Sequence, residues 1–145
     1  MTKIIETFSD EETRQLAYDI ASQVVPGTVI TLIGDLGVGK TVFAGGFAKG
    51  LGIDEPISSP TFTIVQSYDG GRLTLNHFDV YRIGDPEEMD EIGFDDYVFG
   101  DGVCLIEWAN LISDIMPDEY TEILIEKNPS KGFNYRKITI TEFGK

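Results

Sequence analysis

A glycine-rich segment, Gly34-Asp35-Leu36-Gly37-Val38-Gly39-Lys40-Thr41, directly follows the run Thr28-Val29-Ile30-Thr31-Leu32-Ile33. The segment has the P-loop pattern of a glycine, four residues and then Gly-Lys-Thr. The preceding run is short, β-branched and bounded by turn residues, which predicts a buried strand of a parallel sheet. Phe43, Phe47 and Leu51 then recur at four-residue spacing and predict a helix with one apolar face. The sequence therefore predicts strand, loop and helix in the order that a P-loop requires.

Each part of this segment has an expected role in holding a nucleotide. The glycines let the backbone approach a phosphate without Cβ clashes, and the N–H groups at the helix start converge on an anion. Lys40 is expected to reach the β and γ oxygens, and the Thr41 hydroxyl is expected to contact Mg²⁺. The expected nucleotide-binding residues of the segment are Gly34, Asp35, Leu36, Gly37, Val38, Gly39, Lys40 and Thr41.

A metal ion beside such a loop needs an acidic ligand from the end of a neighbouring buried strand. The two candidates for this ligand are Glu107 and Asp79. Glu107 follows the apolar run 103–106, so it projects from a strand end and is favoured over Asp79 as the Mg²⁺ ligand. If Glu107 is the ligand, Asp79 either holds a metal-bound water or orients the attacking water. The alternative is that Asp79 is a structural carboxylate, paired with Arg82 or hydrogen-bonded at a strand end. His77, the single histidine, is expected to make a structural hydrogen bond.

Two further features have both a functional and a structural interpretation. The hydroxyl-rich segment 58–63 lies just beyond the P-loop helix, where it either contacts the γ-phosphate as a switch or is an ordinary loop entering a strand. Trp108 either stacks on a base or a partner, or packs against the protein. Chemistry alone leaves both questions open.

The rest of the chain predicts a mixed sheet with flanking helices. Ser9 and Glu12 form a capping box that predicts a helix from Asp10 to Val24. Alternating runs at 62–68 and 73–81, separated by Asp69-Gly70-Gly71, predict a hairpin. The other expected elements are a short helix from Asp85 through Ile92, an acidic loop from Phe94 to Gly100, and strands at 103–106, 121–126 and 136–141. We therefore expect one P-loop-like α/β domain over residues 1–145, with a mostly parallel central sheet.

Net charge, cysteine content and hydropathy bear on whether the chain binds nucleic acid, is secreted or enters a membrane. The chain has 145 residues with 11 basic and 25 acidic side chains, and its formal charge is −14. This charge repels nucleic-acid phosphates, so any RNA is expected to be held by a partner. Cys104, the single cysteine, lies in an apolar run and favours a buried thiol in a reducing cytoplasm. No window approaches the roughly 18 apolar residues of a membrane span, so secretion and membrane insertion are not expected.

Taken together, the motifs resemble those of the TsaE family, formerly YjeE. The resemblance is carried, in order, by residues 34–41, Ser59-Pro60-Thr61-Phe62-Thr63, His77-Phe78-Asp79-Val80-Tyr81-Arg82 and Glu107-Trp108, and spans nearly the whole chain. It implies a small bacterial Mg²⁺-dependent ATPase required for the threonylcarbamoyladenosine modification of tRNAs that read codons beginning with adenine. A pair of partner proteins, TsaB and TsaD, would carry out the transfer and contact the tRNA.

The resemblance also implies residue roles. Residues 34–41 would bind the phosphates, with Lys40 and Asp79 serving hydrolysis and Thr41 and Glu107 holding Mg²⁺. Thr61 would lie in the switch segment, and Trp108 would lie near the nucleotide and the partner surface. The chain after Asp118 matches no family motif.

Two other functions use the same loop: a small-molecule kinase, and a binding module that distinguishes ATP from ADP with little hydrolysis. Phosphoryl transfer commonly needs several cations around the developing charge. The arginines are Arg14, Arg72, Arg82 and Arg136, of which Arg82 is the expected internal cation. This scarcity favours an ATPase that is slow until a partner supplies an arginine finger.

Overall fold

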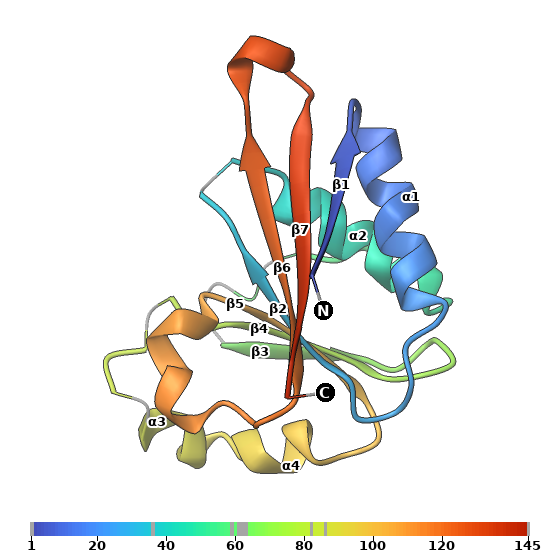
Figure 1. The fold of residues 1–145 in the computed structure, drawn as a ribbon. Helices are drawn as coiled ribbons and strands as arrows, with labels where there is room; N and C mark the ends of the chain where they lie inside the picture. The colour runs from blue at the N-terminus through green and yellow to red at the C-terminus, as the bar shows by residue number, and fades with distance from the viewer. Residues whose placement is uncertain are drawn as a thin grey trace.

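The computed structural model describes residues 2–35, 37–58, 60, 64–81, 83–85 and 87–144. In these ranges seven strands form one sheet in the order β1-β7-β6-β2-β5-β4-β3 (Figure 1). The strands are β1 Thr2–Thr7, β2 Val29–Ile33, β3 Val65–Tyr68, β4 Leu75–Asp79, β5 Val103–Glu107, β6 Tyr120–Lys127 and β7 Arg136–Phe143. The helices are α1 Asp10–Ala21, α2 Lys40–Gly50, α3 Glu87–Glu91 and α4 Phe94–Val98, with the 3-10 helices η1 Ala109–Ile115 and η2 Pro129–Lys131.

The middle of the sheet is parallel and its edges are antiparallel. Strand β2 pairs in parallel with both β5 and β6, and β4 pairs in parallel with β5. The antiparallel pairs are β1 with β7, β6 with β7, and β3 with β4. The predicted mixed α/β fold is thus confirmed, as is the hairpin that follows α2.

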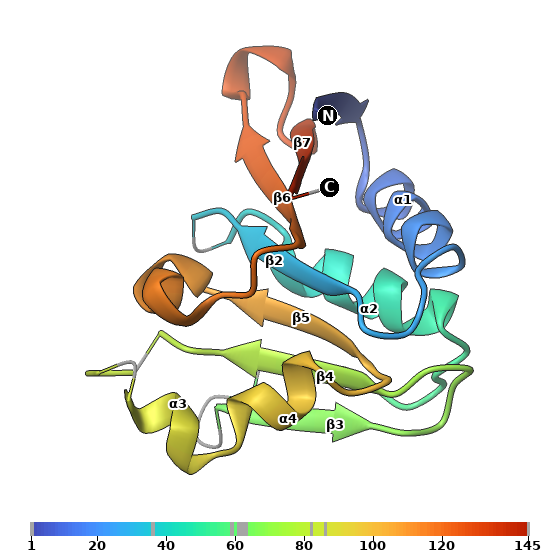
Figure 2. The same ribbon diagram turned by 60° about the horizontal axis from the view of Figure 1, so that its bottom comes forward.

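Side-chain alternation divides the core between the two faces of the sheet. In β5, Val103 and Leu105 join a core under α1 and α2, whereas Cys104 and Ile106 face a second core under α3 and α4. Figure 2 shows the two helix pairs on opposite sides of the sheet. Because β5 is covered on both faces, all five of its residues are buried, as expected for a central parallel strand.

The predicted acidic loop from Phe94 to Gly100 is wrong, because this segment contains α4. Phe94 and Val98 are four residues apart and both are buried, so they form one apolar helix face, while Asp95 and Asp96 are exposed on the other. The Phe94 ring meets the Phe78 ring edge-on, with centroids 5.5 Å apart. Packing against β4 therefore stabilises a helix too short to be evident from its sequence period.

Helix α1 begins as predicted but ends earlier. The Ser9 Oγ accepts a hydrogen bond from the Glu12 N–H, and the Glu12 carboxylate accepts one from the Phe8 N–H. The helix ends at Ala21, three residues before the expected Val24. Arg72 donates hydrogen bonds to the carbonyls of Ala21 and Val24 and so satisfies the end of the helix.

Besides α4, three elements were not predicted: the edge strand β1 and the 3-10 helices η1 and η2. Four of the six residues of β1, Thr2 to Ile4 and Glu6, are exposed, so the strand lacks a clear apolar alternation. The length and hydropathy of the helices also bear on membrane insertion. Over the residues that the structure describes, no helix has both the length and the apolar character that a membrane span needs.

Candidate functional site

The glycine-rich loop (residues 34–41) connects β2 to α2 at the carboxyl end of the parallel strands. Gly37 and Gly39 have positive φ values of 78° and 108°, a region that favours glycine. A Cβ atom on Gly34 would lie 2.8 Å from the Ile125 carbonyl oxygen, so this position requires close backbone approach to β6. Leu36 lies outside the described residues. The backbone conformation at Gly37 and Gly39 and the close packing at Gly34 thus explain why each position holds glycine.

Lys40, at the start of α2, faces Glu107 at the end of β5. The Lys40 Nζ lies 3.9 Å from Glu107 Oε1, and both side chains are almost fully buried. The other carboxylate oxygen, Oε2, lies 2.7 Å from His77 Nε2. Because an ionised carboxylate only accepts hydrogen bonds, Nε2 is the donor to it. The hydrogen bond expected for His77 is therefore present, and its partner is the favoured Mg²⁺ ligand.

Asp79 lies next to Glu107 but has a different environment. The register of the parallel pair β4 and β5 places Asp79 opposite Glu107. The Asp79 Oδ1 accepts a hydrogen bond from the Tyr81 N–H at 3.0 Å, so this carboxylate also closes the turn after β4. Arg82 lies outside the described residues, and its expected pairing with Asp79 stays a prediction.

Trp108 lies between the site and Tyr81. The Lys40 Nζ lies 4.4 Å from the centroid of the Trp108 ring, which is cation–π distance. The Tyr81 ring centroid lies 4.8 Å from that of Trp108. Trp108 also has a positive φ of 65° at the start of η1, a conformation uncommon for a bulky residue. The Trp108 ring thus packs between Lys40 and Tyr81.

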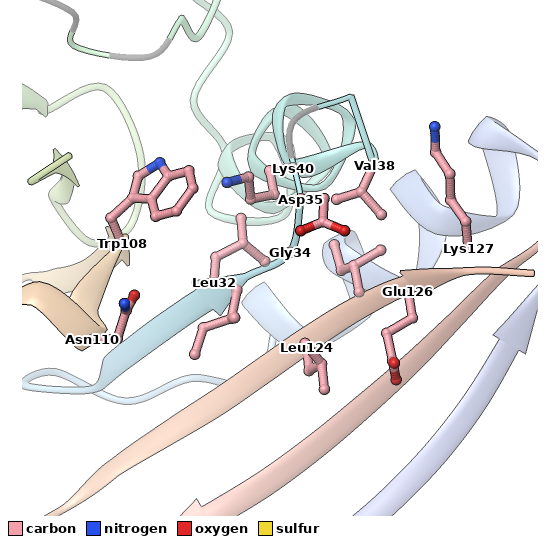
Figure 3. A pocket seen from close by; sticks show the side chains of 12 residues that line it. Leu32, Gly34, Asp35, Val38, Lys40, Trp108, Asn110, Leu124, Glu126 and Lys127 are labelled. Atoms are coloured by element: carbon pink, nitrogen blue, oxygen red, sulfur yellow. The ribbon is translucent and has the colours of Figure 1, made fainter.

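A cavity of about 630 Å³ lies beside the glycine-rich loop (Figure 3). Its wall combines the loop, the segment after β5 and the end of β6. Among the lining residues are Gly34, Asp35, Val38, Lys40, Trp108, Asn110 and 124–127. Figure 3 shows the Lys40 ammonium turned toward Trp108 at one end of this cavity.

The metal-ligand candidates are hard oxygen donors. In the described part of the chain, no group of three or more His, Cys, Asp or Glu side chains is placed to hold a metal ion. Mg²⁺ is commonly bound by one or two carboxylates together with substrate phosphates and water. The Glu107 carboxylate and the Thr41 hydroxyl, which lies in the first turn of α2, fit that donor set. Thr61, the expected switch residue, lies outside the described residues.

Sequence reasoning missed Arg136. Its Nε donates to the Val38 carbonyl oxygen in the glycine-rich loop at 2.6 Å, and the residue is only 9% exposed. Arg82, the expected internal cation, lies outside the described residues, so that expectation stays a prediction. Arg136 is a second, buried cation, and it contacts the loop. The two contacting residues are 98 positions apart, so no local pattern could have indicated this pair.

Comparison with known proteins supplies the family. The family model for "Threonylcarbamoyl adenosine biosynthesis protein TsaE" matches residues 7–138. The chain belongs to the TsaE family. The tRNA threonylcarbamoyladenosine biosynthesis protein TsaE of Bacillus subtilis is 48% identical over 138 residues, covering 95% of this chain and 84% of that relative. The TsaE protein of Treponema pallidum is 44% identical over 113 residues, covering 78% of this chain and 82% of that relative.

A solved structure agrees with this TsaE assignment. The crystal structure of Bacillus subtilis YdiB superimposes with a TM-score of 0.82 at 42% sequence identity and covers 99% of this chain and 87% of that one. The resemblance to TsaE drawn from the motifs is thereby confirmed. Membership of the TsaE family assigns the chain to tRNA threonylcarbamoyladenosine biosynthesis.

Proposed function

We propose that this chain is a Mg²⁺-dependent ATPase that supports threonylcarbamoyladenosine formation in the cytoplasm by acting on the TsaB and TsaD pair. One observation carries the proposal. The glycine-rich loop lies between a buried parallel strand and a helix, and its lysine, Lys40, faces Glu107 at 3.9 Å across the site. This pair supports the proposal, because phosphate oxygens need a cation such as Lys40 and a metal ion needs a carboxylate such as Glu107 beside it.

The residues have distinct tasks in this proposal. The loop N–H groups and Lys40 bind the phosphates and stabilise the charge that develops on them during hydrolysis. Glu107 and Thr41 would hold Mg²⁺, which would supply positive charge for the β and γ oxygens. Asp79 orients the attacking water from the end of β4. The His77 hydrogen bond keeps the Glu107 carboxylate turned toward Lys40.

The positions of the arginines support partner activation. Arg14 is exposed on α1, Arg72 donates to the end of α1, and Arg136 donates to the backbone of the loop. None of these three described arginines is placed as an arginine finger, a group that raises phosphoryl-transfer rates by about 10³–10⁵. The described part of the chain thus supplies no arginine finger. We therefore expect slow turnover by the chain alone and faster turnover with a partner. The charge of −14 favours tRNA contact through the partners rather than through this chain.

The test is phosphate release from Mg-ATP by the purified chain, alone and with the TsaB and TsaD pair, using Lys40→Ala as the blank. We expect slow release alone and strong stimulation by the pair. Fast release that the pair leaves unchanged would contradict partner activation. Transfer of the γ-phosphoryl group to a small molecule would indicate a kinase, and tight ATP binding without release in any mixture would indicate a nucleotide sensor.

A further inference from the structure

We infer that Arg136 is a positioning residue that orients the Val38–Gly39 peptide, so that the Gly39 N–H faces the anion side of the glycine-rich loop. This inference rests on the proposed nucleotide-binding function. It assigns a task to the segment after Asp118, for which the sequence motifs suggested none. The residue acts through the loop backbone and does not itself contact the reacting atoms.

The guanidinium of Arg136 is shared between the loop and the hairpin formed by β6 and β7. Its Nε donates to the Val38 carbonyl oxygen at 2.6 Å. Its Nη1 donates to the carbonyl oxygens of Phe133 at 3.0 Å and Tyr135 at 2.7 Å. The planar guanidinium presents several donors in a rigid fork. The hairpin therefore holds the guanidinium in place, and the guanidinium holds the carbonyl of Val38.

The geometry of the peptide unit converts this contact into an orientation of the Gly39 N–H. In a planar trans peptide the carbonyl and the N–H point in opposite directions, and the described residues contain no cis peptide bond. When the Val38 carbonyl points at Arg136, the N–H of the same peptide points away from Arg136. In a P-loop, such N–H groups are the ones that cradle phosphate.

The peptide at this place needs an external constraint. Gly39 has a φ of 108°, and glycine populates positive and negative φ about equally. Its own conformational preference therefore does not select the orientation of the preceding peptide. The Val38 side chain is buried, at 2% exposure, but this anchors the residue before the peptide rather than its carbonyl. Arg136 supplies the missing constraint with a charge-assisted hydrogen bond.

The charge of Arg136 adds to the effect. Among the ion pairs formed by the described residues, none includes Arg136. Its three recorded acceptors are neutral backbone carbonyls, and the side chain is buried. A buried positive charge on one side of the loop favours an anion on the other side, where the Gly39 N–H points. Burial strengthens this attraction, because solvent and salt screen a buried charge less.

The experiment compares Arg136→Met and Arg136→Lys with Arg14→Met in the full-length chain. Arg14 is exposed on α1, so its substitution removes the same charge without touching the loop. Two quantities are measured: the affinity for Mg-ATP, with KM and kcat in the presence of the TsaB and TsaD pair, and the amide chemical shifts of glycines labelled with ¹⁵N. Gly45, which lies in the middle of α2, is the internal reference for the shifts, because a Cβ there would meet no atom within 4 Å whereas one on Gly39 would lie 3.8 Å from Arg136 Nε.

Arg136→Met is expected to weaken ATP binding by roughly 10-fold or more, the scale of one lost hydrogen bond to a charged group. The Gly39 amide resonance should move while that of Gly45 stays in place. Arg136→Lys should give an intermediate result, because lysine keeps the charge but not the fork. Arg14→Met should match the unsubstituted chain. If Arg136→Met fails to fold, the same two readouts on Arg136→Lys decide the question.

The inference is overturned if the Gly39 resonance is unchanged in the folded Arg136 variants, whatever happens to the affinity. It is also overturned if the resonance moves while ATP affinity stays within about twofold of that of Arg14→Met, since the orientation would then not matter for binding. A third outcome is that the Gly39 resonance moves in the Arg136 variants while neither the variants nor the unsubstituted chain binds ATP. The proposed function would then fail, while the control of the Val38–Gly39 peptide by Arg136 would stand.

Discussion

Asp79 and Glu107 are register partners at the carboxyl ends of the parallel strands β4 and β5, yet their carboxylates have different contacts. Glu107 faces Lys40 at 3.9 Å and accepts a hydrogen bond from His77. Asp79 accepts a hydrogen bond from the backbone N–H of Tyr81. Two adjacent carboxylates in different environments are suited to different tasks, and here the one beside the lysine is the better candidate for the metal ion.

Lys40→Ala should reduce ATP hydrolysis by orders of magnitude, because it removes the positive charge that faces the site. Loss of one electrostatic group at a reacting centre costs about 10²–10³ in kcat. The measurement is steady-state phosphate release with the TsaB and TsaD pair. Lys49→Ala is the matched control, since Lys49 is exposed in the last turn of the same helix. Equal rates for the two variants would refute the role given to Lys40.

Glu107→Gln should raise the Mg²⁺ concentration that gives half-maximal activity, because Mg²⁺ prefers an anionic oxygen ligand. Glutamine keeps the size of the side chain and an acceptor for His77. Asp79→Asn should instead lower kcat with little change in the Mg²⁺ titration. Both titrations use the same phosphate-release assay. The reverse pattern, with the titration shifted in Asp79→Asn alone, would move the metal ligand to β4.

Gly46→Ala and Gly45→Ala should change stability in opposite directions. A Cβ on Gly46 would approach the Arg14 backbone carbonyl closer than any real Cβ contact, whereas one on Gly45 meets nothing within 4 Å. Overpacking between α1 and α2 should cost about 1–3 kcal/mol. Alanine at Gly45 should stabilise the helix by up to about 1 kcal/mol. Urea unfolding measures both, and a stabilised Gly46→Ala would contradict the close packing of the two helices.

Cys104 should be unreactive in the folded chain at pH 8. Burial raises the pKa of its thiol to about 12, against an ordinary value of 9.0. The folded state therefore keeps the thiol protonated, and the thiolate is the reactive form. Reaction with an aromatic disulfide reagent, followed by absorbance, should be slow in buffer and fast in urea. Fast reaction under native conditions would show that α4 opens away from β5, since the thiol packs under α4 beside the Tyr97 carbonyl.

Local patterns predicted most of the fold. The strand β2, the glycine-rich loop and α2 are encoded in consecutive residues, and the β3–β4 hairpin has a glycine turn between alternating runs. Helix α4 was missed because its stability comes from packing on Phe78 rather than from its own short period. Strand β1 was missed because an exposed edge strand has no alternation to recognise, and its pairing with β7 joins opposite ends of the chain.

The candidate site divides in the same way. Lys40 and the three glycines follow from the loop pattern, and Glu107 follows from its place at the end of a buried run. No local pattern predicts that His77 contacts Glu107 or that Arg136 contacts Val38. The two residues of each pair lie 30 and 98 positions apart, respectively. No spacing in the sequence specifies which strand lies beside which.

The sequence by itself determined where the chain turns, which faces are apolar and where an anion-binding backbone is placed, because these depend on residues within a few positions of one another. The tertiary structure decided which side chains meet. The sheet order brings β5 beside β2 and the start of β7 beside the glycine-rich loop. This order depends on burying both faces of β2 and β5 at once, which is a property of the whole core and not of any segment.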